Sequence, residues 1–187
     1  MRLFVALEIP SAVRGNLASF VEQLRTLAPQ ARWVRPENLH VTLKFIGETR
    51  PEKLDAIRAA LAAVRSPQDV TIDFLGLGFF PNEKHPRVFW AGIEASANLK
   101  TLAADIEAAT EKLRISPEKR PFSPHLTLAR FEPPQLPEEL RATIRENAAR
   151  EFGSLAGKEF HLIESKLKPS GAEYTTLESF PFVVTEA

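Results

Sequence analysis

The stretch Asn38–Gly47 reads NLHVTLKFIG, and its first half alternates apolar with polar residues. Val41 and Leu43 occupy one side of this alternation, and His40 and Thr42 occupy the other. Because side chains i and i+2 of a strand project from the same face, the pattern predicts a half-buried strand. Surface strands ordinarily carry Lys, Glu or Ser on the outer face. His40 and Thr42 are therefore either polar residues on a solvated face or the functional groups of a site, and this stretch alone does not decide between the two.

The same pattern occurs a second time, because HLTL at 125–128 repeats the HVTL at 40–43. Two of the chain's 4 histidines therefore stand in one local pattern. Each copy follows a proline-containing approach, RPENLH in the first case and FSPH in the second. The repeat predicts two related halves that bring their histidine and threonine side chains to one cleft, about a pseudo-two-fold axis.

Hydrophobic periodicity divides the remaining chain into short strands and amphipathic helices. Strands are predicted at 2–9, 31–34, 39–46, 70–80, 87–94, 125–131, 158–167 and 174–184. Helices are predicted at 10–27, 51–64, 97–113 and 137–150. Strands and helices alternate irregularly, with one hairpin at PNEKHP and another near the end of the chain. This order predicts an α+β fold with mainly antiparallel sheets.

Composition narrows the class of function. The length of 187 residues suits a single domain over 1–187 made of two related lobes. The 24 Lys and Arg residues balance 24 Asp and Glu residues, which excludes a global basic field for long nucleic acid but permits a local basic cleft. The absence of cysteine excludes disulfides and thiolate catalysis. The opening MRLFVALEIP is too short an apolar run for a signal peptide or membrane span, so we expect a cytoplasmic protein. We also expect a monomer.

A cleft with two imidazoles and two hydroxyl groups suits displacement at phosphorus. Imidazole titrates near neutral pH, so one histidine can accept a proton from the nucleophile while the other donates to the leaving oxygen. Threonine hydroxyls can bind the non-bridging oxygens of the phosphoryl group. In-line displacement needs acid and base on opposite sides of phosphorus, which a pseudo-two-fold site supplies. Because imidazole activates the nucleophile, no metal and no cofactor are expected.

Four stretches carry a resemblance to a known family: RLFVALEIP, NLHVTLKFIGE, PRVFWAGI and RPFSPHLTLAR. The paired motifs are similar to the two HxTx signatures of the 2H phosphoesterase superfamily. More closely, nearly the whole chain resembles the bacterial and archaeal RNA 2′,3′-cyclic phosphodiesterases, historically called 2′-5′ RNA ligases. The resemblance implies a bilobal LigT-like fold, with two pseudo-two-fold-related lobes of mainly antiparallel sheet around a central cleft and helices outside.

The resemblance also implies an activity and a role for each motif residue. It implies hydrolysis of a 2′,3′-cyclic phosphate, on an RNA end or a small nucleotide, to a 2′-phosphate by opening the bond to the 3′ oxygen. The proton donor then falls on His40 and the proton acceptor that activates water falls on His125. Thr42 and Thr127 would hold the phosphate. Zero net charge suggests a small footprint on RNA.

Three further residues are candidate substrate contacts. Arg130 follows the second motif and suits a phosphate or a base, but an ideal strand would turn it away from His125 unless a twist or bulge intervenes. Phe122 is either core or a stacking surface for a base. Lys44 should share the face of His40 and raise the positive potential there.

Other conspicuous residues have structural interpretations. Trp33 and Trp90 are expected in the core, with stacking on a base as the alternative. His85 in the PNEKHP turn is expected to be solvated, and His161 is expected to be structural. Arg14 is expected on a solvated helix face.

Two alternative functions stay open. Ligation that forms 2′-5′ linkages is the reverse of the same displacement, with a 5′-hydroxyl in place of water, so the sequence does not separate it from hydrolysis. A nucleotide- or RNA-binding module without turnover is the other alternative. Intact histidine and threonine in both motifs favour an enzyme, because binding alone needs no paired acid and base.

Overall fold

The computed structural model describes residues 1–66, 69–132 and 136–182. The helices are α1 (Ser11–Arg25), α2 (Leu54–Ala62), α3 (Ala97–Glu111) and α4 (Glu138–Glu146), with 3-10 turns η1 (Pro36–Asn38) and η2 (Pro51–Lys53). The strands are β1 (Arg2–Glu8), β2 (Arg32–Trp33), β3 (His40–Glu48), β4 (Val70–Phe80), β5 (Val88–Ala95), β6 (His125–Arg130), β7 (Glu151–Gly157), β8 (Glu159–Lys168) and β9 (Gly171–Pro181).

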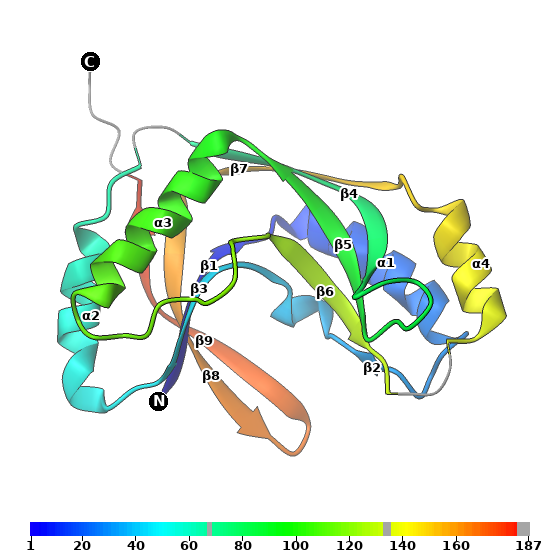
Figure 1. Ribbon diagram of the computed structural model, residues 1–187, viewed down its shortest axis with the longest axis horizontal. Helices are drawn as coiled ribbons and strands as arrows, with labels where there is room; N and C mark the ends of the chain where they lie inside the picture. Colours follow the sequence, from blue (N-terminus) through cyan, green and yellow to red (C-terminus); the bar gives the residue numbers. More distant parts are fainter. Residues whose placement is uncertain (67–68, 133–135, 183–187) are drawn as a thin grey trace.

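These strands form two antiparallel sheets with helices packed outside them (Figure 1). The four-stranded sheet has the order β3-β1-β8-β9, and the five-stranded sheet has the order β2-β6-β5-β4-β7. Helices α2 and α3 lie together beside the four-stranded sheet, whereas α1 packs against β7 of the other sheet (Figure 1). The α+β fold with antiparallel sheets is thereby confirmed. Residues of both sheets contribute to one main hydrophobic core.

The interior position of β1 explains its uninterrupted apolar run. Leu3, Val5 and Leu7 point into the main core. Phe4 and Ala6 point the other way, into a small second cluster on the opposite face of the sheet. A strand that is buried on both faces has no exposed side to fill with polar residues. This opposite face is the one that carries the first motif.

Strand β7 was not predicted, and it is an edge strand of the five-stranded sheet. Its sequence is EFGSLAG, in which only Phe152 and Gly157 are buried. Glycine and serine have weak strand preferences, so the local pattern is poor, and the segment becomes a strand by pairing with β4. The chain then passes through Lys158 into β8 of the four-stranded sheet. The last predicted strand is β9, and residues 183 and 184 of that prediction lie outside the described residues.

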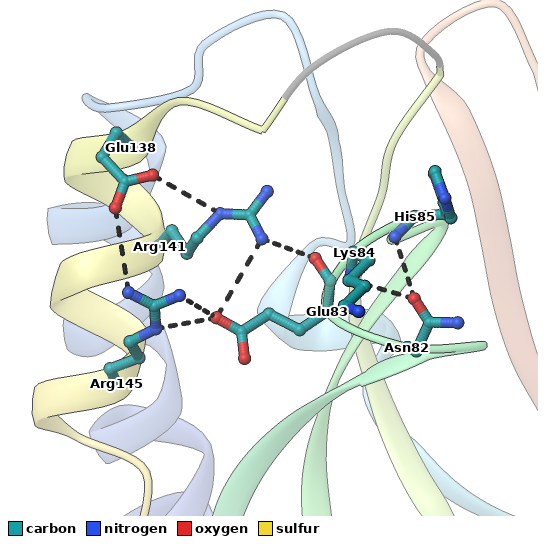
Figure 2. Close-up of polar contacts among 7 residues, drawn as sticks. All are labelled: Asn82, Glu83, Lys84, His85, Glu138, Arg141 and Arg145. Carbon is teal, nitrogen blue, oxygen red and sulfur yellow. Dashed lines mark hydrogen bonds and ion pairs between the residues drawn. The ribbon is translucent and has the colours of Figure 1, made fainter.

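The predicted PNEKHP turn connects β4 to β5 and is tied to α4 (Figure 2). Arg145 Nε donates to the carboxylate of Glu83 at 2.7 Å, and Arg141 Nη1 donates to the Glu83 backbone carbonyl at 2.6 Å. The backbone N–H of His85 donates to Asn82 Oδ1 at 2.9 Å. The side chain of His85 is exposed, as predicted for a turn.

In the part of the chain that the structure describes, no helix is long and apolar enough to cross a membrane.

Candidate active site

The two HxTx motifs lie on β3 and β6, one strand in each sheet. β3 is an edge strand of the four-stranded sheet, and β6 lies between β2 and β5. Both strands begin at the motif histidine, His40 in β3 and His125 in β6. Cα atoms of the two strands approach within 8 Å, and Figure 1 shows the strands meeting near the centre of the molecule. Two segments far apart in sequence are thus brought together.

A β-bulge follows the threonine of the first motif. Thr42 pairs with Ala6 of β1, and the neighbouring residue of β1, Val5, pairs with Lys44. Leu43 is therefore an extra residue on β3, which breaks the two-residue alternation. Leu43 and Lys44 are both buried as a result. The prediction that Lys44 shares the face of His40 was wrong for this reason.

The second motif has a bulge at the same position. Thr127 and Ala129 pair with adjacent residues of β5, which leaves Leu128 as the extra residue. Leu128 and Ala129 are buried, and Arg130 is exposed. The bulge shifts the alternation by one residue, so Arg130 returns to the face that carries His125. A role for Arg130 required such a bulge, and the fold supplies it.

Both motif histidines hydrogen-bond through Nδ1 to a backbone carbonyl two residues earlier in the chain. His40 Nδ1 lies 3.3 Å from the carbonyl oxygen of Asn38, and His125 Nδ1 lies 2.9 Å from that of Ser123. A carbonyl oxygen can only accept, so Nδ1 carries the proton in each case. Each ring is thereby oriented with Nε2 left to exchange a proton with another molecule. The acceptor is the residue two positions before the histidine in both motifs.

Lys44 holds the approach to the second motif instead of contacting a substrate. Its side chain is 0% exposed, and Nζ lies 2.7 Å from Glu107 Oε1 of α3. The same ammonium donates to the Ser116 carbonyl at 2.8 Å. Glu107 Oε1 also accepts the backbone N–H of Glu118 at 3.1 Å. A buried ammonium with these partners cannot reach a ligand in the cleft, so the predicted substrate contact of Lys44 is contradicted.

The aromatic candidates occupy different places. Phe122 packs against the main core, and the indole N–H of Trp33 donates to a backbone carbonyl at 2.8 Å. Trp90 pairs with Thr127 and so lies on the motif face of the five-stranded sheet. A Cβ on Gly78 would lie 2.2 Å from the ring of Trp90, so this glycine allows the indole to lie across the sheet.

A pocket of about 710 Å³ opens beside His40, lined by the four-stranded sheet, by α1 and by the end of β7. Its lining includes His161, Tyr174 and Thr176 from β8 and β9, and Arg14 from α1. Sequence reasoning missed this pocket because its residues come from segments that only the tertiary structure brings together. The prediction that Arg14 lies on a solvated helix face was wrong, since its side chain is half-buried and Nη1 donates to a backbone carbonyl of η1.

His161 is structural, as predicted, although it also lines the pocket. The ring is buried and Nδ1 lies 2.8 Å from the hydroxyl oxygen of Ser179. Nε2 lies 3.8 Å from Glu159 Oε1. These contacts hold the ring in the floor of the pocket, between β8 and β9.

Burial lowers the pKa of His40 below its ordinary value of 6.5. The positive charges of Arg14 and His161 lower this pKa further, whereas the hydrogen bond to Asn38 and the negative charge of Glu8 raise it. Desolvation has the largest effect, because a half-buried ring loses part of the water that stabilises imidazolium. The lowered pKa favours the neutral form of His40 more than for an ordinary histidine.

We expect an NMR titration of the free protein to show His40 losing its proton below pH 6.5. Glu8→Gln should move the titration to still lower pH, because the variant removes a negative charge that favours imidazolium. Histidine ring resonances followed between pH 4 and 9 would measure both values. A His40 that titrates above 6.5, or a Glu8→Gln titration that moves upward, would contradict this electrostatic account.

Comparison with known proteins places the chain in a family. The model of the family described as LigT like Phosphoesterase matches residues 7–90 and 93–174. The RNA 2′,3′-cyclic phosphodiesterase of Methanothermobacter thermautotrophicus is 33% identical over 181 residues, covering 96% of this chain and 98% of the relative. The protein of the same name from Archaeoglobus fulgidus is 34% identical, covering 96% and 99%. The crystal structure of E. coli LigT complexed with 3′-AMP superposes with a TM-score of 0.78 at 27% identity, covering 97% of both chains. The chain belongs to the LigT-like phosphoesterases of the 2H superfamily.

Proposed function

We propose that this chain is an RNA 2′,3′-cyclic phosphodiesterase, which hydrolyses 2′,3′-cyclic phosphate ends to 2′-phosphate ends without a metal ion. The observation that carries the proposal is the matched geometry of the two motifs. Each supplies a histidine whose Nδ1 donates to the residue two positions earlier, and each is followed by a bulge at the same place. The names of the relatives from Methanothermobacter and Archaeoglobus support the same activity.

In the proposed reaction, His125 and His40 act on opposite sides of phosphorus. Neutral His125 accepts a proton from water at Nε2, and the water oxygen attacks phosphorus as the bond to the 3′ oxygen breaks. Protonated His40 gives its Nε2 proton to the departing 3′ oxygen. The product carries a 2′-phosphate and a 3′-hydroxyl, and proton exchange with solvent restores both rings. No metal is needed, because the imidazoles supply both proton transfers.

The two threonines and Arg130 complete the proposed phosphate site. The hydroxyls of Thr42 and Thr127 share a sheet face with the histidines two residues earlier, where they can donate to the non-bridging oxygens. Arg130 lies on the same face of β6 as His125, so its guanidinium can stabilise negative charge on RNA. The bound anion also favours imidazolium, which offsets the effect of burial on the pKa of His40.

The chain is further proposed to work as a single domain of two related lobes, each contributing one motif, at 40–43 and 125–128. A cytoplasmic location and a monomeric state stay predictions. Size-exclusion chromatography with light scattering on the purified full chain measures the second of these directly.

The test of the function is product analysis on 2′,3′-cyclic nucleotides and on short RNAs that end in a cyclic phosphate. We expect 2′-phosphate products, assigned by phosphorus NMR, and undiminished hydrolysis in EDTA. A 3′-phosphate product would mean that the bond from phosphorus to the 2′ oxygen breaks instead of the bond to the 3′ oxygen. Loss of hydrolysis in EDTA would refute the metal-independent mechanism. If no product forms while the nucleotide binds, the chain is a binding module.

A further inference from the structure

We propose that Asn38 positions the proton donor of the site. Its side chain fixes the turn η1 to the β8–β9 hairpin, and its backbone carbonyl orients the ring of His40. The inference rests on the proposed function, and specifically on the donor role of His40. It makes Asn38 a positioning residue, which acts on the reaction through His40 and not through the substrate.

Asn38 makes hydrogen bonds in two directions. Its Nδ2 donates to the carbonyl oxygen of Ala172 in β9 at 2.9 Å, and the two residues are 134 positions apart in the chain. Its own carbonyl oxygen accepts from Nδ1 of His40 at 3.3 Å. A carbonyl group holds a ring in one orientation only when the peptide unit that carries it is itself fixed. The bond to Ala172 fixes that unit from an element distant in sequence.

Two arginines fix the same turn. Arg14 Nη1 donates to the carbonyl oxygen of Pro36 at 2.5 Å, and the Arg35 guanidinium donates to the carbonyl oxygen of Ser170 at the end of the hairpin. This hairpin extends away from the rest of the four-stranded sheet (Figure 1). Because η1 ends two residues before His40, these contacts hold the backbone immediately before the start of β3.

The bond to Asn38 decides which edge of the His40 ring faces the substrate. The ring packs against Phe4 at 6.1 Å and against Tyr174 at 5.7 Å between ring centroids. These ring contacts would also accommodate the imidazole after half a turn about its bond to Cβ. The bond from Nδ1 distinguishes the two orientations, because the turned ring would present a carbon atom to the Asn38 carbonyl. Loss of this restraint therefore lowers the fraction of molecules in which Nε2 can protonate the 3′ oxygen.

Asn38→Ala tests the inference, because it removes the donor to Ala172 and keeps the backbone carbonyl group. Asn16→Ala is the matched control, since Asn16 Nδ2 also donates to a distant backbone carbonyl, that of Phe152, at 2.9 Å. Each variant thus loses one amide hydrogen bond of the same length, and urea unfolding should show a similar small loss of stability in both. The substrates are 2′,3′-cyclic AMP and its analogue with sulfur in place of the bridging 3′ oxygen.

We expect Asn38→Ala to lower kcat for cyclic AMP by about tenfold to a hundredfold, the range for a misplaced catalytic group, with little change in KM. Its kcat for the sulfur analogue should stay close to the wild-type value, because a thiolate whose conjugate acid has a pKa of about 8.5 departs without a proton donor. Asn16→Ala should retain wild-type kcat on both substrates. Arg35→Met removes a second contact of η1 and should show the same dependence on the substrate with a smaller loss. Arg35 is exposed, so this variant tests the turn even if Asn38→Ala does not fold.

An NMR titration of the histidine rings gives a second readout. The pKa of His40 should be lower in Asn38→Ala than in the wild type, because the hydrogen bond to Asn38 raises it. The charged groups that act on His40, which are Arg14, Glu8 and His161, are unchanged in this variant. The change in titration therefore reports the loosened hydrogen bond.

Three outcomes would overturn the positioning role. They are an unchanged kcat for cyclic AMP in Asn38→Ala or in Arg35→Met, equal losses on the two substrates, and a loss of the same size in Asn16→Ala. The last would mean that any lost bond between distant segments lowers activity. A wild-type protein that hydrolyses neither substrate would instead refute the proposed function itself.

Discussion

Hydrolysis of a 2′,3′-cyclic nucleotide should fall by about 10²–10⁴-fold in kcat when either His40 or His125 is replaced by Ala, because each variant removes one of the two proton transfers. Neither side chain belongs to the hydrophobic core, since His40 is half-buried and His125 is exposed. Unfolding by urea should therefore change little in both variants. Full activity in either variant, with the fold intact, would refute the two-histidine mechanism.

His85→Ala is the matched control for these two variants. His85 is exposed like His125, but it lies in the turn between β4 and β5 that α4 holds, and not on a motif strand (Figure 2). Its replacement should leave kcat unchanged. A comparable loss of kcat in His85→Ala would mean that removal of any histidine lowers activity. The losses in the two motif variants would then not support a catalytic role for His40 and His125.

A sulfur substitution separates the acid from the base. With the bridging 3′ oxygen of the substrate replaced by sulfur, the leaving group is a thiolate, whose conjugate acid has a pKa of about 8.5 and which departs without a proton donor. His40→Ala should recover most of its activity on this substrate, and His125→Ala should not. Equal losses in both variants would contradict the assigned roles, and recovery in His125→Ala alone would reverse them.

Lys44→Met should destabilise the protein by about 3 kcal/mol, the size expected when one partner of a buried ion pair is removed. The variant leaves the carboxylate of Glu107 without its ammonium and the Ser116 carbonyl without a donor. Activity should fall as well, because these contacts hold the segment that leads to Ser123 and His125. Urea unfolding monitored by circular dichroism measures the first effect.

Two further variants show whether the charge or the packing is responsible. In Lys44→Met with Glu107→Leu, no charge is left unpaired, so most of the lost stability should return. Lys168→Met removes an ion pair of the same 2.7 Å length, but one in which both side chains are about half exposed. Its urea midpoint should stay close to that of the wild type. A Lys44→Met protein as stable as Lys168→Met would contradict the buried anchoring role.

Much of the fold was readable from local patterns, and the exceptions share a cause. The strands with strong apolar alternation were predicted to within a few residues, and so was the turn at His85. Strand β7 was missed because Gly153 and Ser154 give it a weak pattern, and only pairing with β4 makes it a strand. The strand propensity of a segment does not reveal whether a strand distant in sequence will pair with it.

The sequence by itself determined the candidate site residues, because two copies of one short pattern give the same pair of side chains on the same strand face. The tertiary structure decided which neighbours join them. The bulge in β3 turns Lys44 into the interior, and the bulge in β6 places Arg130 on the face that carries His125. The pocket beside His40 is assembled from β1, α1, η1, β3, β7, β8 and β9. The two-residue period of a strand predicts the direction of each side chain until a bulge adds one residue and reverses it. The local pattern predicts neither the bulge nor the distant segments that line the pocket.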